Sequence, residues 1–325
     1  MIDRRGVVAS LAGLFAAGPA LAAPKPKALR RPWGAPDLEG VWSSASYTEL
    51  ERPEQLKSLI VSPEDAKVWE ATLAKTGGVN VPNDPLGQAQ SEFPETGSGL
   101  MRINGEIRGS MIVDPADGQL PYSDEALKRL GMGKHRRRRG YDNVEERPQN
   151  ERCLTAGTGG VPLIAEADAN VVEIVQTRDA IVIVGEKYHD ARVVRLNGSA
   201  TPDLPASWNG ESFGRWEGDT LVVETTRFRP GDQLRAEGFY ISGEAKVTER
   251  FRRTSPGEIS YTFTVDDPAT YSRPWRAEVV FGPAPGRMFE YACHEGNYSL
   301  TSILAAARQG NQPTPPATPA APAKP

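Results

Sequence analysis

Hydrophobic and polar positions alternate along much of the second half of the chain, which is the pattern of strands with one buried face. In residues 258–265, one face would carry Tyr261, Phe263 and Val265. The opposite face would carry Ser260, Thr262 and Thr264. This alternation predicts a sheet with a dry side and a polar side.

Pairs of such segments flank short turn sequences and therefore predict hairpins. The predicted pairs are 171–176 with 180–186, 213–216 with 220–226, 246–252 with 258–265, and 275–281 with 287–293. A strand over 188–196 ends at Asn197-Gly198, a strong hairpin turn. Consecutive hairpins form a meander, and a long meander curls or closes so that no edge is exposed. We predict a mainly β fold, an antiparallel meander curled into a partly closed barrel with minor helices.

Other elements are expected around this meander. Strands are predicted at 40–43 and 108–113. Ser62 and Pro63 have the residue types of a helix N-cap and first helical position, which predicts a helix to about residue 75. A short helix is predicted over 123–130, and a final one over 300–308 that would plug or brace the barrel. The interval 77–99 is longer than a usual connection, so we expect a lid or a packed irregular loop there.

The first 23 residues have the pattern of an export signal. Arg4 and Arg5 precede an apolar run over 6–17, and Ala20-Leu21-Ala22 matches an Ala-x-Ala cleavage site. Adjacent arginines indicate the twin-arginine route, which predicts a periplasmic or secreted protein. The run is roughly half of the ~20 apolar residues that span a bilayer, so we expect no integral membrane segment.

The rest of the chain is predicted to hold one domain. Residues 24–36 and 309–325 are rich in proline and poor in apolar side chains, so we expect a linker and a disordered tail. The β-rich globular domain would then cover 37–308. The chain carries 32 Gly and 28 Pro, which favours many strands joined by turns over long helices.

The charge balance argues against nucleic acid as a partner. The net charge is −4, whereas binding to phosphates needs a net basic face. One basic run is the exception, at Lys134, His135 and Arg136 to Arg139. It indicates either a contact for an anionic partner or a solvated loop.

The chain has only two cysteines, Cys153 and Cys293, and they are expected to pair in an oxidising compartment. The bond would close a loop of about 140 residues and stabilise the fold by roughly 4 to 5 kcal/mol. An alternative hypothesis makes Cys293 a nucleophile or a metal ligand beside His294.

Two of the three histidines have a carboxylate next to them in the sequence. His189 precedes Asp190, and His294 precedes Glu295. Histidine is the usual general base near neutral pH, and a neighbouring carboxylate or tyrosine can orient it or act as the complementary acid. The predicted catalytic set is His189, His294, Glu295, Tyr291 and Asp267, with Tyr298 and Asp266 as alternatives. Structural histidines bonded to the backbone are the competing interpretation.

Three further residues are predicted to contact a substrate. Arg273 and Trp275 would offer a cation and a stacking face to a sugar or a carboxylate, and Trp216 would add a second ring. Packing at a barrel rim is the alternative for them. A zinc site at His189, His294 and Glu295 has suitable ligand types but no metal-binding spacing, so no cofactor is expected.

Several segments resemble known families. Gly40-x-Trp42 at the start of a strand resembles the opening of lipocalin and calycin barrels, which implies a barrel that holds a ligand. A broader resemblance is to a large family of secreted bacterial proteins with no established activity. The segments that carry it are 36–42, 151–153, 214–226, 263–268 with Trp275, and 291–298. It implies secretion and transfers no mechanism.

These observations lead to three functional hypotheses. The first is a cofactor-free acid–base enzyme, a lyase, hydratase or isomerase, that acts on a small, partly apolar molecule. The second is a non-catalytic periplasmic barrel that binds such a molecule as a ligand. The third is an envelope interaction module that uses the tail and the basic run as contacts. The sequence predicts neither the substrate nor the oligomeric state.

Overall fold

The structure is a computed structural model that describes residues 29–74, 99–131, 143–147, 149, 151–155, 159–164, 170–198, 205–235 and 239–310. The predicted signal sequence, the basic run and the proline-rich tail after 310 lie outside the described residues. So do the first part of the linker and most of the 77–99 interval.

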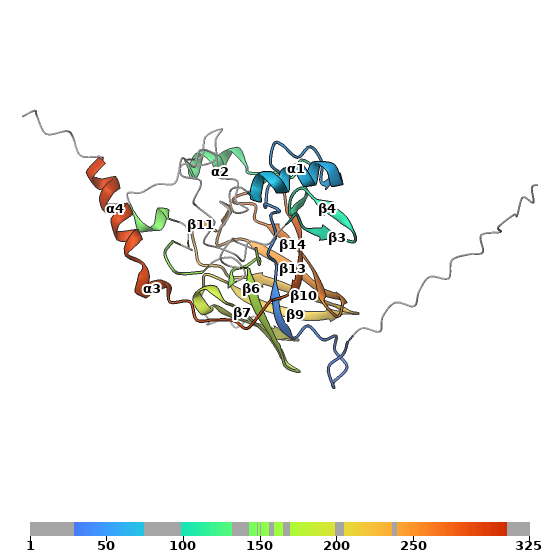
Figure 1. The fold of residues 1–325 in the computed structure, drawn as a ribbon. Helices are drawn as coiled ribbons and strands as arrows, with labels where there is room; N and C mark the ends of the chain where they lie inside the picture. The colour runs from blue at the N-terminus through green and yellow to red at the C-terminus, as the bar shows by residue number, and fades with distance from the viewer. Residues whose placement is uncertain are drawn as a thin grey trace, which may run out of the picture.

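A closed β-barrel dominates the fold (Figure 1). Within the described residues, ten strands form one sheet in the order β1-β6-β7-β8-β9-β10-β13-β14-β15-β5. Pairing of β1 with β15 closes nine of these strands into the barrel, with Trp42 opposite Pro283 and Ser43 opposite Gly282. The prediction of a mainly β barrel is therefore confirmed, and the closure goes further than the partial one expected.

The barrel strands are β1 (Gly40–Ser43), β6 (Val171–Gln176), β7 (Ala180–Gly185), β8 (Ala191–Leu196), β9 (Glu211–Glu217), β10 (Thr220–Thr226), β13 (Lys246–Ser255), β14 (Glu258–Asp266) and β15 (Trp275–Pro283). The short β5 (Ile112–Asp114) adds to the edge of β15. Three predicted hairpins are present: β6 with β7, β9 with β10, and β13 with β14.

A smaller layer packs beside the barrel. It consists of α1 (Pro63–Leu73) and a sheet of β2 (Ile60–Val61), β3 (Arg102–Ile103) and β4 (Glu106–Arg108). Its own apolar cluster is Leu56, Val61, Ala66, Trp69, Leu73, Leu100 and Ile107. Ser62 caps α1 as predicted, because its side chain accepts a hydrogen bond from the Asp65 backbone N–H.

The remaining described elements are short, apart from the last helix. They are α2 (Asp124–Arg129), the 3-10 turns at Val144–Glu146 and Lys187–His189, β11 (Gln233–Leu234), β12 (Tyr240–Ile241), α3 (Cys293–Gly296) and α4 (Tyr298–Gly310). Ser123 caps α2, as the sequence predicted. None of the described side chains of α4 is fully buried, and the helix runs along the outside of the barrel (Figure 1), so it does not plug the barrel.

The predicted hairpin at Asn197-Gly198 is wrong. Strand β8 pairs with β9 in parallel, with Val194 beside Ser212. Asn197 does adopt a positive φ of 57°, as a turn residue would, but its backbone N–H donates to the Gly214 carbonyl. The chain therefore leaves β8 and returns beside it in the same direction. The turn signal was misleading because a turn residue determines only the local bend and does not determine how the next strand pairs.

Two other strand predictions are also wrong. Residues 287–292 form no strand, since β14 pairs with one edge of β15 while β5 and β1 pair with the other. The predicted strand 108–113 is divided between β4 and β5, which belong to different sheets. Gly109 lies at the division, where a Cβ atom would lie 2.7 Å from the Ser58 carbonyl oxygen, so only glycine fits without a shift.

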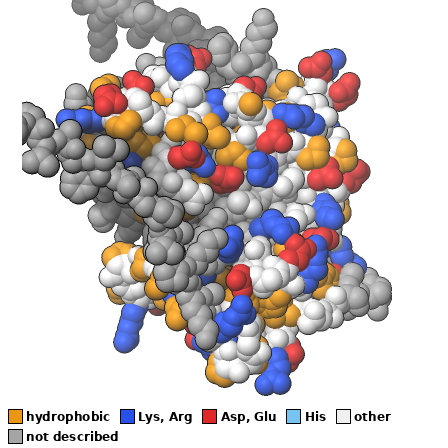
Figure 2. All heavy atoms as spheres, turned by 90° about the vertical axis from the view of Figure 1, so that its right-hand side faces the viewer, with side chains coloured by type: hydrophobic (Ala, Val, Ile, Leu, Met, Phe, Trp, Pro, Cys, Tyr) orange, Lys and Arg blue, Asp and Glu red, His pale blue; other side chains and the backbone are white. Residues whose placement is uncertain are grey.

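The dry side of the sheet faces the barrel interior. Tyr261, Phe263 and Val265 are at most 1% exposed and belong to one large apolar cluster with residues from the other barrel strands. Polar side chains lie outside, and acidic and basic groups are interspersed over the face drawn in Figure 2. The barrel is thus filled by its own core.

A buried ion pair lies within this core. Both terminal nitrogens of Arg192 bond the Glu249 carboxylate, at 2.8 and 3.1 Å, and Glu249 is 0% exposed. The Tyr261 hydroxyl donates to the same carboxylate at 2.9 Å and accepts from the Leu163 backbone N–H. Burial raises the pKa of Tyr261, and the negative charge of Glu249 adds to this effect, so the phenol stays protonated.

The buried ion pair leads to a prediction about the free energy of unfolding of single and double variants. Arg192→Met leaves a charged Glu249 without its main partner in the core, so the free energy of unfolding should fall by about 3 to 5 kcal/mol. Arg192→Met/Glu249→Gln removes both charges and keeps an acceptor for Tyr261, so it should lose less than the single variant. Urea denaturation measures both values. A double variant that loses more than the single one would contradict this account.

Candidate functional site

The segment that follows β15 crosses the turn between β7 and β8. We call residues 284–297 the strap and residues 186–190 the turn. The Phe289 backbone N–H donates to Glu186 Oε1 at 2.7 Å. The Tyr291 backbone N–H donates to His189 Nε2 at 3.2 Å. The strap thus brings Tyr291 to His189, two residues of the predicted catalytic set.

Aromatic rings and an amine meet where the strap crosses the turn. The rings of Tyr188 and Tyr291 lie edge to face with centroids 5.6 Å apart. Lys187 Nζ lies 5.4 Å from the first centroid and 5.6 Å from the second, within the range of cation–π attraction. Tyr188 and His189 both adopt positive φ, of 67° and 53°. Such a backbone is strained for residues other than glycine and is found at functional sites more often than elsewhere.

A disulfide fixes the far end of the strap. Cys153 and Cys293 are bonded, with Cα atoms 5.8 Å apart, which confirms the predicted pair. The hypothesis that Cys293 is a nucleophile or metal ligand is therefore wrong for this oxidised state. The bond fits a protein that works outside the reducing cytoplasm.

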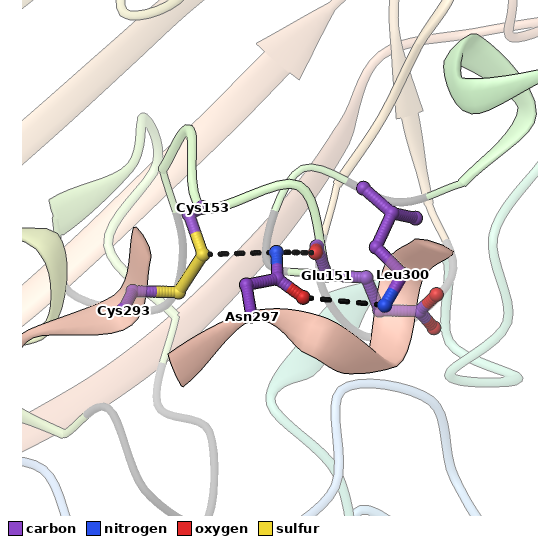
Figure 3. Close-up of a disulfide and its surroundings, with 5 residues drawn as sticks. All are labelled: Glu151, Cys153, Cys293, Asn297 and Leu300. Carbon is purple, nitrogen blue, oxygen red and sulfur yellow. Dashed lines mark hydrogen bonds between the residues drawn. A yellow bond between two sulfur atoms is a disulfide. The ribbon is translucent and has the colours of Figure 1, made fainter. Parts of the chain in front are cut away.

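Asn297 completes the attachment (Figure 3). Its Nδ2 donates to the Glu151 carbonyl at 2.9 Å and lies 3.3 Å from Cys153 Sγ. Its Oδ1 accepts from the Leu300 backbone N–H and so satisfies one donor in the first turn of α4. The strap, α3 and the start of α4 are consequently held to the segment 151–153.

A cleft of about 490 Å³ opens between these parts. It is lined by Glu151, Lys187, Tyr188, Tyr291, Ala292, Cys293, Gly296, Asn297 and Ser299. We call it the strap cleft. Its walls come from three stretches that are far apart in the sequence, and it lies on the outside of the packed barrel.

The structure divides the predicted catalytic set. His189 is exposed at the edge of the strap cleft, and His294 and Glu295 are exposed on α3, next to Cys293. No hydrogen bond joins the two imidazoles in the described part of the chain. Asp267 is not part of this arrangement, because it is 1% exposed and accepts bonds from the Ser242 backbone N–H and hydroxyl. Its carboxylate stabilises a turn, so its predicted catalytic role is not supported.

The predicted substrate-binding residues lie elsewhere. Trp275 is 1% exposed and packs against Phe239, Phe263 and Tyr271 in the core, so the prediction that its ring stacks on a substrate is wrong. Arg273 is exposed and pairs with Asp114 at 3.1 Å. Trp216 is half-buried on β9 against the barrel core. None of the three lines the strap cleft.

Two charged residues at the turn, Asp190 and Arg235, were not in the predicted catalytic set. Burial raises the pKa of Asp190, although Thr155, Asn209 and the charge of Arg235 oppose the shift. Burial also lowers the pKa of Arg235 to about 9, while Asp190 opposes it. Paired shifts of this kind are typical of functional sites. Asp190 is adjacent to His189 in the sequence, but no local pattern marks Arg235.

No metal site is seen in the residues that the structure describes. No group of three or more His, Cys, Asp or Glu side chains there is arranged to hold an ion. The zinc hypothesis at His189, His294 and Glu295 thus gains no support. In the same residues, no helix is long and apolar enough to cross a membrane.

The disulfide predicts a measurable effect on stability and on the strap. Cys153→Ser/Cys293→Ser should lower the free energy of unfolding by about 4 to 5 kcal/mol, because the unfolded chain regains the freedom of a long loop. Cleavage within the strap by trypsin should become faster, as followed by mass spectrometry. A thiol reductant should reproduce both effects in the wild type and change nothing in the double variant. Equal unfolding curves for the two proteins would refute the prediction.

Comparison of the sequence with protein-family models found no matching family, and comparison with curated protein sequences found no match either. The residues of the strap, the turn and the segment 151–153 are therefore the basis for assigning a function.

Proposed function

We propose that this protein is exported and binds a small, partly apolar molecule with an anionic group in the strap cleft. The observation that carries the proposal is the position of Lys187, whose ammonium group faces two tyrosine rings at one wall of the cleft. A cation beside aromatic rings suits a carboxylate attached to an apolar or planar body.

The size and place of the cleft support this function. Its volume of about 490 Å³ is in the range of pockets that hold small molecules. The barrel interior is filled by Tyr261, Phe251, Phe281 and their neighbours, so a lumen of the lipocalin type is not the basis of the proposal. The binding face is instead the outer surface, where the strap closes over the turn.

Export to the periplasm by the twin-arginine route is part of the proposal. It is supported by Arg4, Arg5 and the cleavage pattern that follows them, and by the disulfide. The resemblance to secreted bacterial proteins agrees with it.

Ligand binding is tested by calorimetric titration with small carboxylates, from acetate to benzoate and indole acetate. Lys187→Met and Tyr291→Leu should each weaken binding of the best ligand by about tenfold, because the first removes the cation that pairs with the carboxylate and the second removes a ring that contacts the apolar body. Tyr298→Leu is the matched control, since Tyr298 is 80% exposed on α4 and does not line the cleft. Equal affinity in all three variants, or no binding by the wild type, would exclude this site.

Acid–base catalysis on the bound molecule is the second candidate. His189 Nε2 accepts the Tyr291 N–H, so the neutral imidazole carries its proton on Nδ1. The imidazole is exposed beside the cleft. Its Nε2 can accept a substrate proton once the bond from the Tyr291 N–H opens, and the ring then acts as a general base.

The catalytic hypothesis requires a separate test. The protein is incubated with the carboxylates that bind and with their β-hydroxy and α,β-unsaturated forms. NMR spectra of these compounds then report hydration, elimination or isomerisation. His189→Asn should abolish turnover with little change in affinity, whereas His294→Asn should reduce it less because His294 has no described contact with the turn. Binding without turnover in the wild type would leave the protein as a binding protein.

A further inference from the structure

Two arginines share one tryptophan beside the strap cleft. The guanidinium carbon of Arg229 lies 4.6 Å from the centroid of the Trp208 ring, and that of Arg152 lies 5.4 Å from it. Arg152 comes from the segment that carries Cys153, and Arg229 follows β10. Trp208 and Arg152 are half-buried and Arg229 is exposed, so the group is open to solvent. We call these three residues the arginine–tryptophan group.

The two cations have no carboxylate partner among the described residues. The other arginines that stack on tryptophan differ in this respect. Arg31 lies over Trp33 and pairs with Glu39 at 3.1 Å, and Arg253 lies over Trp42 and lies 3.9 Å from an Asp37 carboxylate oxygen. The arginine–tryptophan group has the stacking and lacks the counter-charge.

The pKa shift of Arg152 also indicates that the two positive charges are not neutralised. Burial lowers the pKa of Arg152, Glu145 opposes the shift, and the positive charge of Arg229 adds to it. Glu145 is exposed and forms no ion pair with either arginine in the described structure. Like charges held near one ring repel each other, and an anion between or beside them would relieve that repulsion.

The group is held in place from below by Arg235, which is 4% exposed. One terminal nitrogen of Arg235 donates to the Trp208 carbonyl, and the other donates to Gln149 Oε1 at 2.9 Å. Asn209, which follows Trp208 in the sequence, donates a side-chain hydrogen bond to the Gly159 carbonyl at 3.1 Å. The Arg229 backbone N–H donates to the Ser207 carbonyl at 2.8 Å. The three side chains therefore project from segments that are bonded to one another.

We propose that the arginine–tryptophan group binds an oxyanion of the phosphate type. Two guanidinium groups present forked N–H donors and two positive charges, which match the several oxygens and up to two negative charges of a phosphate better than the single charge of a carboxylate. Trp208 orients both guanidinium groups. The site is separate from the strap cleft, so its failure leaves the carboxylate site untouched.

The test uses the full mature chain at constant ionic strength and titrates inorganic phosphate while tryptophan fluorescence and thermal unfolding are followed. Wild-type protein should show a saturable fluorescence change and a rise in Tm. Arg152→Gln and Arg229→Gln should each weaken phosphate binding by about tenfold or more, because each removes a charge-assisted pair. Trp208→Leu should remove the fluorescence response.

Arg178→Gln is the matched control, because Arg178 is an exposed arginine at the tip of the β6–β7 hairpin and should leave binding unchanged. Circular dichroism verifies that each variant is folded. Vesicles of phosphatidylglycerol or phosphatidylcholine distinguish the source of the phosphate. Binding to free phosphate indicates a soluble ligand, and arginine-dependent binding to phosphatidylglycerol vesicles alone indicates a lipid headgroup. Failure of the wild type to bind either, or equal binding by wild type and both arginine variants, would overturn the proposal.

Discussion

Closure of the barrel between β1 and β15 is the constraint on which the rest of the structure depends. The pairing of Trp42 with Pro283 removes the free edges of the sheet and turns its dry face inward. Side chains then fill the interior, including the Arg192–Glu249 pair, whose charges require mutual compensation there. A filled barrel leaves its outer surface and its loops for recognition, and both proposed sites lie there.

The disulfide organises that outer surface. It joins the segment 151–153 to the strap and thereby sets the turn, the two tyrosines and Lys187 around one cleft. Arg152 lies between the two attachments of that segment, because Glu151 accepts a bond from Asn297 and Cys153 forms the disulfide. The strap cleft and the arginine–tryptophan group are thus built on a shared support, although their chemistry differs.

Local patterns predicted the local structure well. Ser62 and Ser123 cap helices as predicted. The alternation of apolar and polar residues correctly identified which side chains of β14 face the core, and three hairpins have the expected partners. Long-range pairing was harder, since nothing in Asn197-Gly198 reveals that β9 returns in parallel, and residues 287–293 have strand character but no free edge to join. Site prediction had the same limit. His189 and Tyr291 are in contact, as the predicted catalytic set required. Trp275, however, lies in the core, and Arg235 differs from other arginines only because the fold buries it, which no local pattern reveals.

Closure of the barrel also affects the kinetics of folding. Hairpins can form one after another along a chain, but the contact between positions 42 and 283 joins distant segments that must first find each other. Formation of the native topology should therefore be slow compared with that of a simple hairpin ladder. If the chain leaves the cytoplasm already folded, this search has to finish before translocation, at a stage when the thiols of Cys153 and Cys293 are still reduced.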